Sequence, residues 1–261
     1  MPRITMMMDN LNERNAEFPQ VPLTQPVFLN SVPKAGTHLI RNIMRMFVPV
    51  EQQYHATFIQ HPILRQHGVP AFNPQRPMLS WGHLLYSDDA AILLRATRTV
   101  LMVRDPYDWV LARARFFMSE NFDGMTNHLK GGRIDTNDLL NLMIFGIHDK
   151  APGMEEIFRH NAVCWLGTKA YVIRYEDMIK HLKQIESRQA ELYFAGLFDA
   201  CGINMPADWR ARVAIGADRK QSATARENLD GATDLPDELP DMQKKLVDYA
   251  APGLRALLGY A

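Results

Sequence analysis

A short apolar run that stops at a proline and is followed at once by a helical pattern places the strongest constraint on the fold of this chain. Residues 27–32 are mostly apolar and end at Pro33, as expected of a buried strand. Over residues 37–47 the apolar side chains fall on one face of a helix: Leu39, Ile40, Ile43, Met44 and Phe47. The sequence therefore predicts a strand, a tight turn and a helix, in that order.

Further strand and helix patterns alternate along the rest of the chain. Strands are predicted at 78–81, 99–103 and 170–175, and helices at about 107–119, 136–147, 153–166 and 178–200. Because strands alternating with helices form parallel sheets covered on both faces, we expect α/β architecture, with a single domain and a central parallel sheet flanked by helices. Long loops are expected at 60–77, 123–133 and 234–241.

The first 25 residues differ from the rest of the chain. They are polar, contain Pro19 and Pro22, and lack the apolar core of a secretory signal. We expect a flexible N-terminal arm over residues 1–25 and the folded domain over 26–261. With 261 residues and 47% hydrophobic content, the chain can bury a full core.

Charge and cysteine content restrict the partners and the compartment. Lys+Arg and Asp+Glu both number 29, so a formal charge of zero gives no general attraction to nucleic acid or acidic membranes. No apolar stretch approaches the roughly 20 residues that span a bilayer. The cysteines, Cys164 and Cys201, argue against a disulfide framework and for a reducing compartment. We therefore expect a cytoplasmic protein that binds neither nucleic acid nor membrane.

The turn between the first strand and its helix carries the residues expected of an anion site. N–H groups at a helix N-terminus lack partners and the helix dipole favours negative charge there, so such a turn suits phosphate or sulfate. Lys34 adds a full charge, Gly36 lets the backbone approach closely, and Thr37 offers a hydroxyl. An ordinary turn that only starts a helix is the alternative. The whole segment reads Pro33-Lys34-Ala35-Gly36-Thr37-His38.

This segment resembles the 5′-phosphosulfate loop of the sulfotransferases that use 3′-phosphoadenosine 5′-phosphosulfate (PAPS), whose usual form is Pro-Lys-Ser-Gly-Thr-Thr. The resemblance implies the sulfotransferase fold, with a P-loop-like phosphate-binding turn, PAPS as donor, 3′-phosphoadenosine 5′-phosphate (PAP) as product and no metal. His38 departs from the pattern, which has Thr there, and Leu39 stands where cytosolic members often have a Trp that stacks on adenine. The implied contacts with the donor come from Lys34, Ala35, Gly36, Thr37 and His38.

Arg104 follows the predicted strand at 99–103, at the strand end where open α/β sheets bind ligands. Its surroundings, Arg-Asp-Pro-Tyr-Asp, resemble the family's 3′-phosphate segment, although an ion pair with Asp105 or Asp108 is the ordinary alternative. The family places a Ser eight positions further on, where this chain has Ala112. The missing hydroxyl implies weaker binding unless Arg113 or Arg115 compensates.

Two later segments also resemble parts of the family's donor site. Tyr175, in Arg-Tyr-Glu-Asp-Met at the end of the third predicted strand, matches a Tyr that contacts adenine. Packing in the core is the alternative for this ring. Arg219 and Lys220 match the Arg-Lys-Gly segment that clamps the 3′-phosphate, but Gln221 replaces the Gly. A solvated basic turn is the alternative for this pair.

His83 is the candidate general base. Trp81-Gly82-His83-Leu84 resembles the family's Thr-His-Leu segment, and His83 precedes Arg104 by 21 residues, enough for a helix and a return strand to the same sheet edge. A structural hydrogen-bonding role is the alternative. His55, His61 and His67 recur every six residues, which shares no helix face, so we expect no metal site there.

These residues together predict a sulfotransferase that moves a sulfuryl group from PAPS to a hydroxyl or amine of a small molecule, such as a secondary metabolite. Lys34 and His83 are the predicted catalytic residues. A nucleotide-dependent P-loop kinase would need Gly-Lys-Ser/Thr, which is absent. A protein that binds the donor without turnover is the other alternative, favoured by His38 and Ala112. The expected acceptor walls are loops 54–75 and 117–135, including Phe117, Phe122 and His128.

Overall fold

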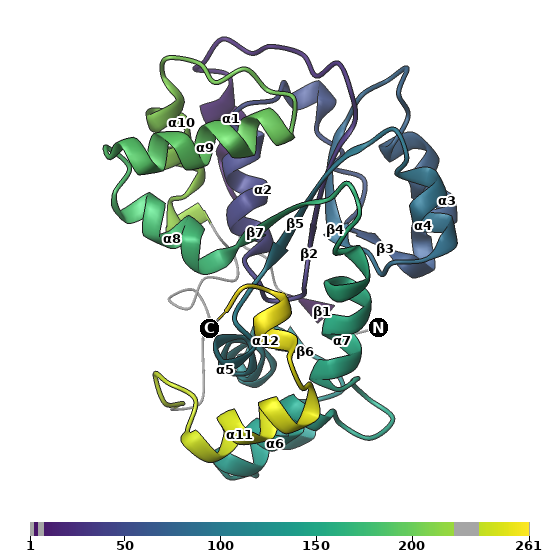
Figure 1. The fold of residues 1–261 in the computed structure, drawn as a ribbon, viewed down its shortest axis with the longest axis vertical. Coiled ribbons are helices and arrows are strands. Elements are labelled where there is room, and N and C mark those ends of the chain that lie inside the picture. The colour runs from purple at the N-terminus through teal and green to yellow at the C-terminus, as the bar shows by residue number, and fades with distance from the viewer. Residues whose placement is uncertain (1–2, 5–7, 222–234, 261) are drawn as a thin grey trace.

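A computed structural model describes residues 3–4, 8–221 and 235–260 (Figure 1). Its centre is a five-stranded sheet with the strand order β3-β4-β2-β5-β7, and every neighbouring pair is parallel. The strands are β2 (Val27–Ser31), β3 (Ile59–Gln60), β4 (Leu79–His83), β5 (Arg98–Val103) and β7 (Tyr171–Arg174). The predicted α/β class, parallel sheet and flanking helices are confirmed.

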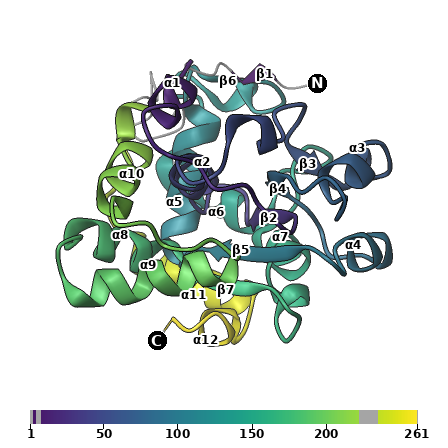
Figure 2. The same ribbon diagram turned by 90° about the horizontal axis from the view of Figure 1, so that it is seen from above.

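Strand β2 lies in the middle of the sheet and is buried on both of its faces. All five of its residues are buried, as are the last five of β5, because helices cover both faces and leave no strand side for water. Figures 1 and 2 place α3 and α4 beside the β3 edge and α8 and α9 beside the β7 edge. The carboxyl ends of all five strands therefore point to one edge of the sheet.

The helices around the sheet are α1 (Leu11–Asn15), α2 (Thr37–Arg45), α3 (Leu64–Ala71), α4 (Asp88–Leu93), α5 (Pro106–Met118), α6 (Thr136–Phe145), α7 (Met154–Asn161), α8 (Tyr175–Lys183), α9 (Arg188–Ala200), α10 (Trp209–Gly216), α11 (Asp241–Ala250) and α12 (Leu254–Leu257). A small antiparallel pair joins β1 (Arg3–Ile4) to β6 (Phe122–Asp123). Helix α10 packs tightly on α2 at Gly216, where an added Cβ would lie 2.5 Å from the Cα of Ile43.

Three sequence predictions are wrong in detail. The single helix expected at 178–200 is two helices, because Ser187 caps the start of α9 by accepting a hydrogen bond from the amide of Ala190. The loop expected at 60–77 contains α3, which includes Pro70 next to its last residue. The helix expected at 153–166 ends at Asn161 and continues as a 3₁₀ turn at 163–165. Of the loop expected at 234–241, residue 234 lies outside the described residues, and α11 begins at Asp241.

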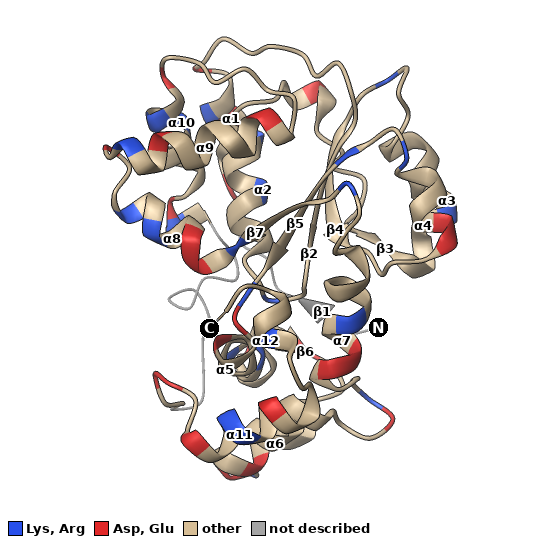
Figure 3. Ribbon diagram, viewed as in Figure 1, with Lys and Arg blue, Asp and Glu red and all other residues tan. Residues whose placement is uncertain are grey.

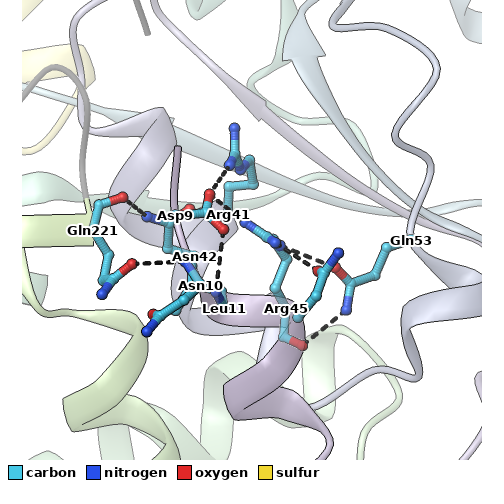
Figure 4. A network of polar contacts seen from close by, with 9 residues as sticks. Asp9, Asn10, Leu11, Arg41, Asn42, Arg45, Gln53 and Gln221 are labelled. Carbon is cyan, nitrogen blue, oxygen red and sulfur yellow. Dashed lines mark hydrogen bonds and ion pairs between the residues drawn. The ribbon is translucent and has the colours of Figure 1, made fainter. Parts of the chain in front are cut away.

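Part of the N-terminal segment packs against α2 (Figure 4). The carboxylate of Asp9 pairs with the guanidinium groups of Arg41 (3.1 Å) and Arg45 (2.8 Å), and Arg45 lowers the pKa of Asp9 against the opposing effect of burial. Leu11 is fully buried. The amide of Asn10 donates to the side chain of Gln221, which follows α10. The domain boundary at residue 25 stays a prediction, although these contacts tie residues 9–15 to the domain.

Charges of both signs are spread over the outer helices, as Figure 3 shows for α8 to α10. Among the described residues, no helix is long and apolar enough to cross a membrane. Cys164 is half-buried and Cys201 is buried, and neither forms a disulfide.

Candidate functional site

A cavity of about 710 Å³ opens at the carboxyl edge of the sheet. Its walls come from the turn after β2, the end of β4, the start and inner face of α5, and the segment around α10. Eight of the predicted site residues line it: Lys34, Gly36, Thr37, His38, His83, Arg104, Tyr175 and Arg219. Ala35 is buried behind the turn, and Lys220 is exposed and outside this lining.

The turn after β2 has the backbone shape of an anion cradle. Lys34 (φ +69°) and Gly36 (φ +102°) both adopt left-handed conformations, which bend the chain from the end of β2 into α2. The amide of Ala35 donates to the carbonyl of Val32 (3.0 Å), so this N–H group is engaged within the turn. The amides of residues 36–38 stand at the N-terminus of α2, where helix geometry provides no partner.

The side chain of Lys34 is held over an aromatic ring. Its Nζ lies 3.0 Å from the centre of the Phe116 ring, and burial lowers the pKa of Lys34 to about 7. The indole of Trp109 donates to the carbonyl of Pro33 (2.5 Å), which fixes the start of the turn against α5. An anion bound beside Lys34 would favour the charged form of its amine.

Arg104 and Tyr175, which both line the cavity, are in direct contact with each other. The Arg104 guanidinium lies 4.5 Å from the centre of the Tyr175 ring, and its Nη1 makes a long hydrogen bond to the carbonyl of Lys34 (3.4 Å). Among the described residues, the buried Nε of Arg104 has no hydrogen-bond partner. Asp105, a possible partner of Arg104, instead pairs with Arg255 at 2.9 Å. A buried donor without a partner is costly, which suits a site completed by an anion.

Gly36 is required by the position of Tyr175. A Cβ on Gly36 would lie 2.6 Å from Cδ2 of the Tyr175 ring, so any other residue would push the ring away. The Tyr175 ring therefore lies against the turn between β2 and α2, here called the phosphate-type turn, and not in the core. This close approach, together with the positive φ, explains why a glycine stands at position 36.

His83 is fixed through one ring nitrogen. Its Nδ1 lies 3.0 Å from the carbonyl oxygen of Ser31, which can only accept, so Nδ1 carries the proton. The Asn30 side chain holds the next residue, donating to the carbonyl of Leu84 (3.1 Å) and accepting from its amide (2.9 Å). This tautomer leaves Nε2 as an acceptor. The ring of Phe58 packs on the imidazole with centroids 4.7 Å apart.

Burial sets the charge of both histidines in the cavity. It lowers the pKa of His83 to about 4, and that of His38 to about 3, with Lys34 contributing in both cases. Both rings are neutral at pH 7. A neutral imidazole with an unprotonated Nε2 can accept a proton from a substrate.

Arg113 and Arg115, the two candidates for compensating the missing hydroxyl at Ala112, make different contacts from α5. The Arg113 guanidinium is buried and donates to the carbonyls of Met143 (2.8 Å) and Pro152 (2.7 Å), so it serves the packing of α5 against α6. Ala112 and Arg115 both line the cavity. Arg115 donates through Nη2 to the carbonyl of Pro236 (2.8 Å).

Several site residues were missed from the sequence. Phe116 follows Ala112 by four positions on the same helical face, a spacing that could have indicated it. Ser31 and Asn30 act across the β2–β4 pairing, which no local pattern reveals. Of the expected acceptor walls, loop 54–75 contributes Phe58 beside His83. Phe117 and Phe122 pack on each other (5.0 Å), and His128 is exposed near Lys150; none of these three lines the described cavity.

No metal centre accompanies the cavity in the part of the chain that the structure describes, since no group of three or more His, Cys, Asp or Glu side chains is placed to bind an ion. A parallel α/β sheet whose first long strand runs through a cationic turn into a helix is an arrangement that suits an anion such as phosphate. Comparison with solved structures identifies the fold more narrowly.

The chain is similar to mouse sulfotransferase SULT7A1 complexed with PAP, with a TM-score of 0.53 and 15% identity over 98% of this chain and 95% of that one. For retinol dehydratase with androsterone and the inactive cofactor PAP, the TM-score is 0.55 and the identity is 12%, over 98% of this chain and 88% of that one. For retinol dehydratase with retinol and PAP, the TM-score is 0.50 and the identity is 13%, over 97% of this chain and 87% of that one. A scan of protein-family models and a search of curated proteins returned no match. This chain has the sulfotransferase fold.

Proposed function

We propose that this protein is a PAPS-dependent sulfotransferase that sulfates a hydroxyl or amine of a small molecule, such as a secondary metabolite, in the cytoplasm. The observation that carries the proposal is that Lys34, His83 and Arg104 line one cavity, although they lie at or just beyond the ends of three different strands. Similar solved structures contain PAP, and PAP is what remains of PAPS after sulfuryl transfer.

The cavity offers a group for each part of the donor. Lys34, the amides of residues 36–38 and the Thr37 hydroxyl suit the 5′-phosphosulfate. Tyr175 suits the adenine. Arg104 and Arg219 suit the 3′-phosphate, and the unpartnered Nε of Arg104 supports this assignment.

Arg115 is the further candidate for the 3′-phosphate, because it lines the cavity one helical turn after Ala112, whereas the buried Arg113 is absent from that lining. Lys220 remains a candidate at the rim. It is exposed, so its contribution would be screened by solvent.

The chemistry follows from the two central residues. PAPS supplies an activated sulfuryl group. His83 Nε2 takes the proton from the acceptor as the new bond to sulfur forms, and the bond from sulfur to the 5′-phosphate oxygen breaks with its electron pair on that oxygen. Lys34 and the turn amides stabilise the charge that grows there.

The lining of the cavity includes apolar side chains, among them Leu39, Leu111 and Phe116. Retinol and androsterone occupy retinol dehydratase, a protein of the same fold. We therefore expect an acceptor with a hydrophobic body that carries its nucleophilic atom to His83.

Donor-dependent stability tests the proposal. Since PAP binds the folded state, it should raise the melting temperature with increasing concentration, and ATP with magnesium should raise it much less. A larger shift with ATP and magnesium would favour the kinase alternative. A shift with PAP but no transfer to any acceptor would favour a binding protein without turnover, the role that His38 and Ala112 leave open.

A further inference from the structure

Ser31, the last residue of β2, connects the phosphate-type turn with the candidate base. Its hydroxyl lies 2.5 Å from the Thr37 hydroxyl and 3.1 Å from Nδ1 of His83. Ser31 is fully buried and Thr37 nearly so. Two side chains from different strands and one from α2 thus form a continuous chain of polar atoms inside the protein.

The carbonyl of Ser31 fixes the direction of the hydrogen bond at the His83 end of this chain. The carbonyl of Ser31 forces Nδ1 of His83 to be the donor, so the Ser31 hydroxyl oxygen can only accept from that same N–H. Either hydroxyl could donate in the hydrogen bond between Ser31 and Thr37. When Ser31 donates, the Thr37 oxygen accepts, and the Thr37 hydroxyl proton is free to point into the cavity that Thr37 lines.

We propose that Ser31 is a positioning residue that relays the occupancy of the phosphate turn to the imidazole of His83. This inference rests on the proposed function. When the Thr37 hydroxyl donates to a bound phosphate, its oxygen becomes a better acceptor for Ser31. The Ser31 oxygen in turn becomes a better acceptor for Nδ1–H. Donor binding therefore strengthens the base and holds its Nε2 toward the acceptor.

Other groups also act on the imidazole and must be separated from the relay. Lys34 on the turn and His38 on α2 are the titratable groups that interact with His83. A bound anion raises the pKa of His83 directly through its charge, whether or not Ser31 is present. The relay adds an increment that should disappear when the Ser31 hydroxyl is removed.

The test is to titrate His83 by NMR, with and without saturating PAP, in the wild type, Ser31→Ala and Ser80→Ala. The resonance is assigned by its loss in His83→Gln. Ser80 is the matched control, because it is a fully buried serine on β4 whose hydroxyl donates to the carbonyl of Val27. PAP should raise the pKa of His83 in all three proteins. In Ser31→Ala the rise should be smaller by a few tenths of a pH unit (~0.1–0.7), because polarisation strengthens an existing hydrogen bond by only about 10–30%.

The outcomes separate the relay from the proposed function. An equal PAP-induced rise in Ser31→Ala and the wild type would overturn the relay and leave sulfotransfer intact. No binding of PAP to the wild type would remove the proposed function itself. If Ser31→Ala fails to fold, Thr37→Val, measured at saturating PAP, must show the same smaller rise. An unchanged rise in that variant would also refute the relay.

Discussion

The buried amine of Lys34 should make donor binding depend steeply on pH. The free protein holds Lys34 with a pKa of about 7, because burial disfavours its charge. A bound phosphate favours the charged form and raises that pKa. Above pH 7 the protein must therefore take up a proton to bind the ligand, and its affinity should fall as the pH rises.

The size of the effect follows from the free pKa alone, provided that the bound form stays protonated. Between pH 7 and pH 8.5 the affinity for PAP should fall by about fifteenfold, and binding at pH 7 should take up about half a proton. The phosphates of PAP lose their second protons near pH 6, so they contribute little in this range. His38 and His83 are already neutral there in the free protein.

Isothermal titration with PAP in two buffers of different ionisation enthalpy measures both quantities. Lys34→Arg is the control, because a guanidinium stays charged and should flatten the pH dependence. Lys34→Met should bind weakly at every pH. Affinity that is constant from pH 7 to 8.5 in the wild type, with no proton uptake, would show that Lys34 is charged in the free protein and that its burial does not control binding.

Three further predictions concern residues around the cavity. Gly36→Ala should lower the free energy of unfolding by about 1–3 kcal/mol in urea denaturation, since its φ is positive and its Cβ would meet Tyr175. Gly131→Ala, with a similar φ but no atom within 4 Å, should cost less, and equal losses would contradict the contact. Arg115→Ala should weaken PAP by about 10–100-fold but leave AMP, which lacks the 3′-phosphate, unaffected in calorimetry; equal losses would place Arg115 elsewhere. Ala112→Ser should tighten PAP or leave it unchanged, whereas marked weakening with an intact fold would mean that position 112 faces another group.

Local patterns predicted the elements that hold the site. The run at β2, the proline after it and the helical face of α2 are all signals within about 20 consecutive residues, and they predicted the strand, turn and helix. The end of β5 likewise predicted where Arg104 would lie. The resemblance to sulfotransferases added His83 and Tyr175, which no local pattern distinguishes from core residues.

Contacts between distant segments could not be read from the sequence. The role of Ser31 depends on β2 pairing with β4, which places residues 52 positions apart within hydrogen-bond distance. Arg113 and Arg115 look alike in sequence. Only the position of α6 shows that Arg113 turns toward the carbonyl of Met143 while Arg115 faces the cavity.

Transfer of radioactive sulfate from labelled PAPS to a pool of small-molecule acceptors tests the central claim most directly. The wild type should move the label to an organic product. His83→Gln should retain PAP affinity and lose about 10²–10⁴-fold in turnover, the usual contribution of a positioned general base. The account is contradicted if the wild type binds PAP but transfers no label to any acceptor. It is equally contradicted if His83→Gln turns over at the wild-type rate with an acceptor that carries only hydroxyl groups.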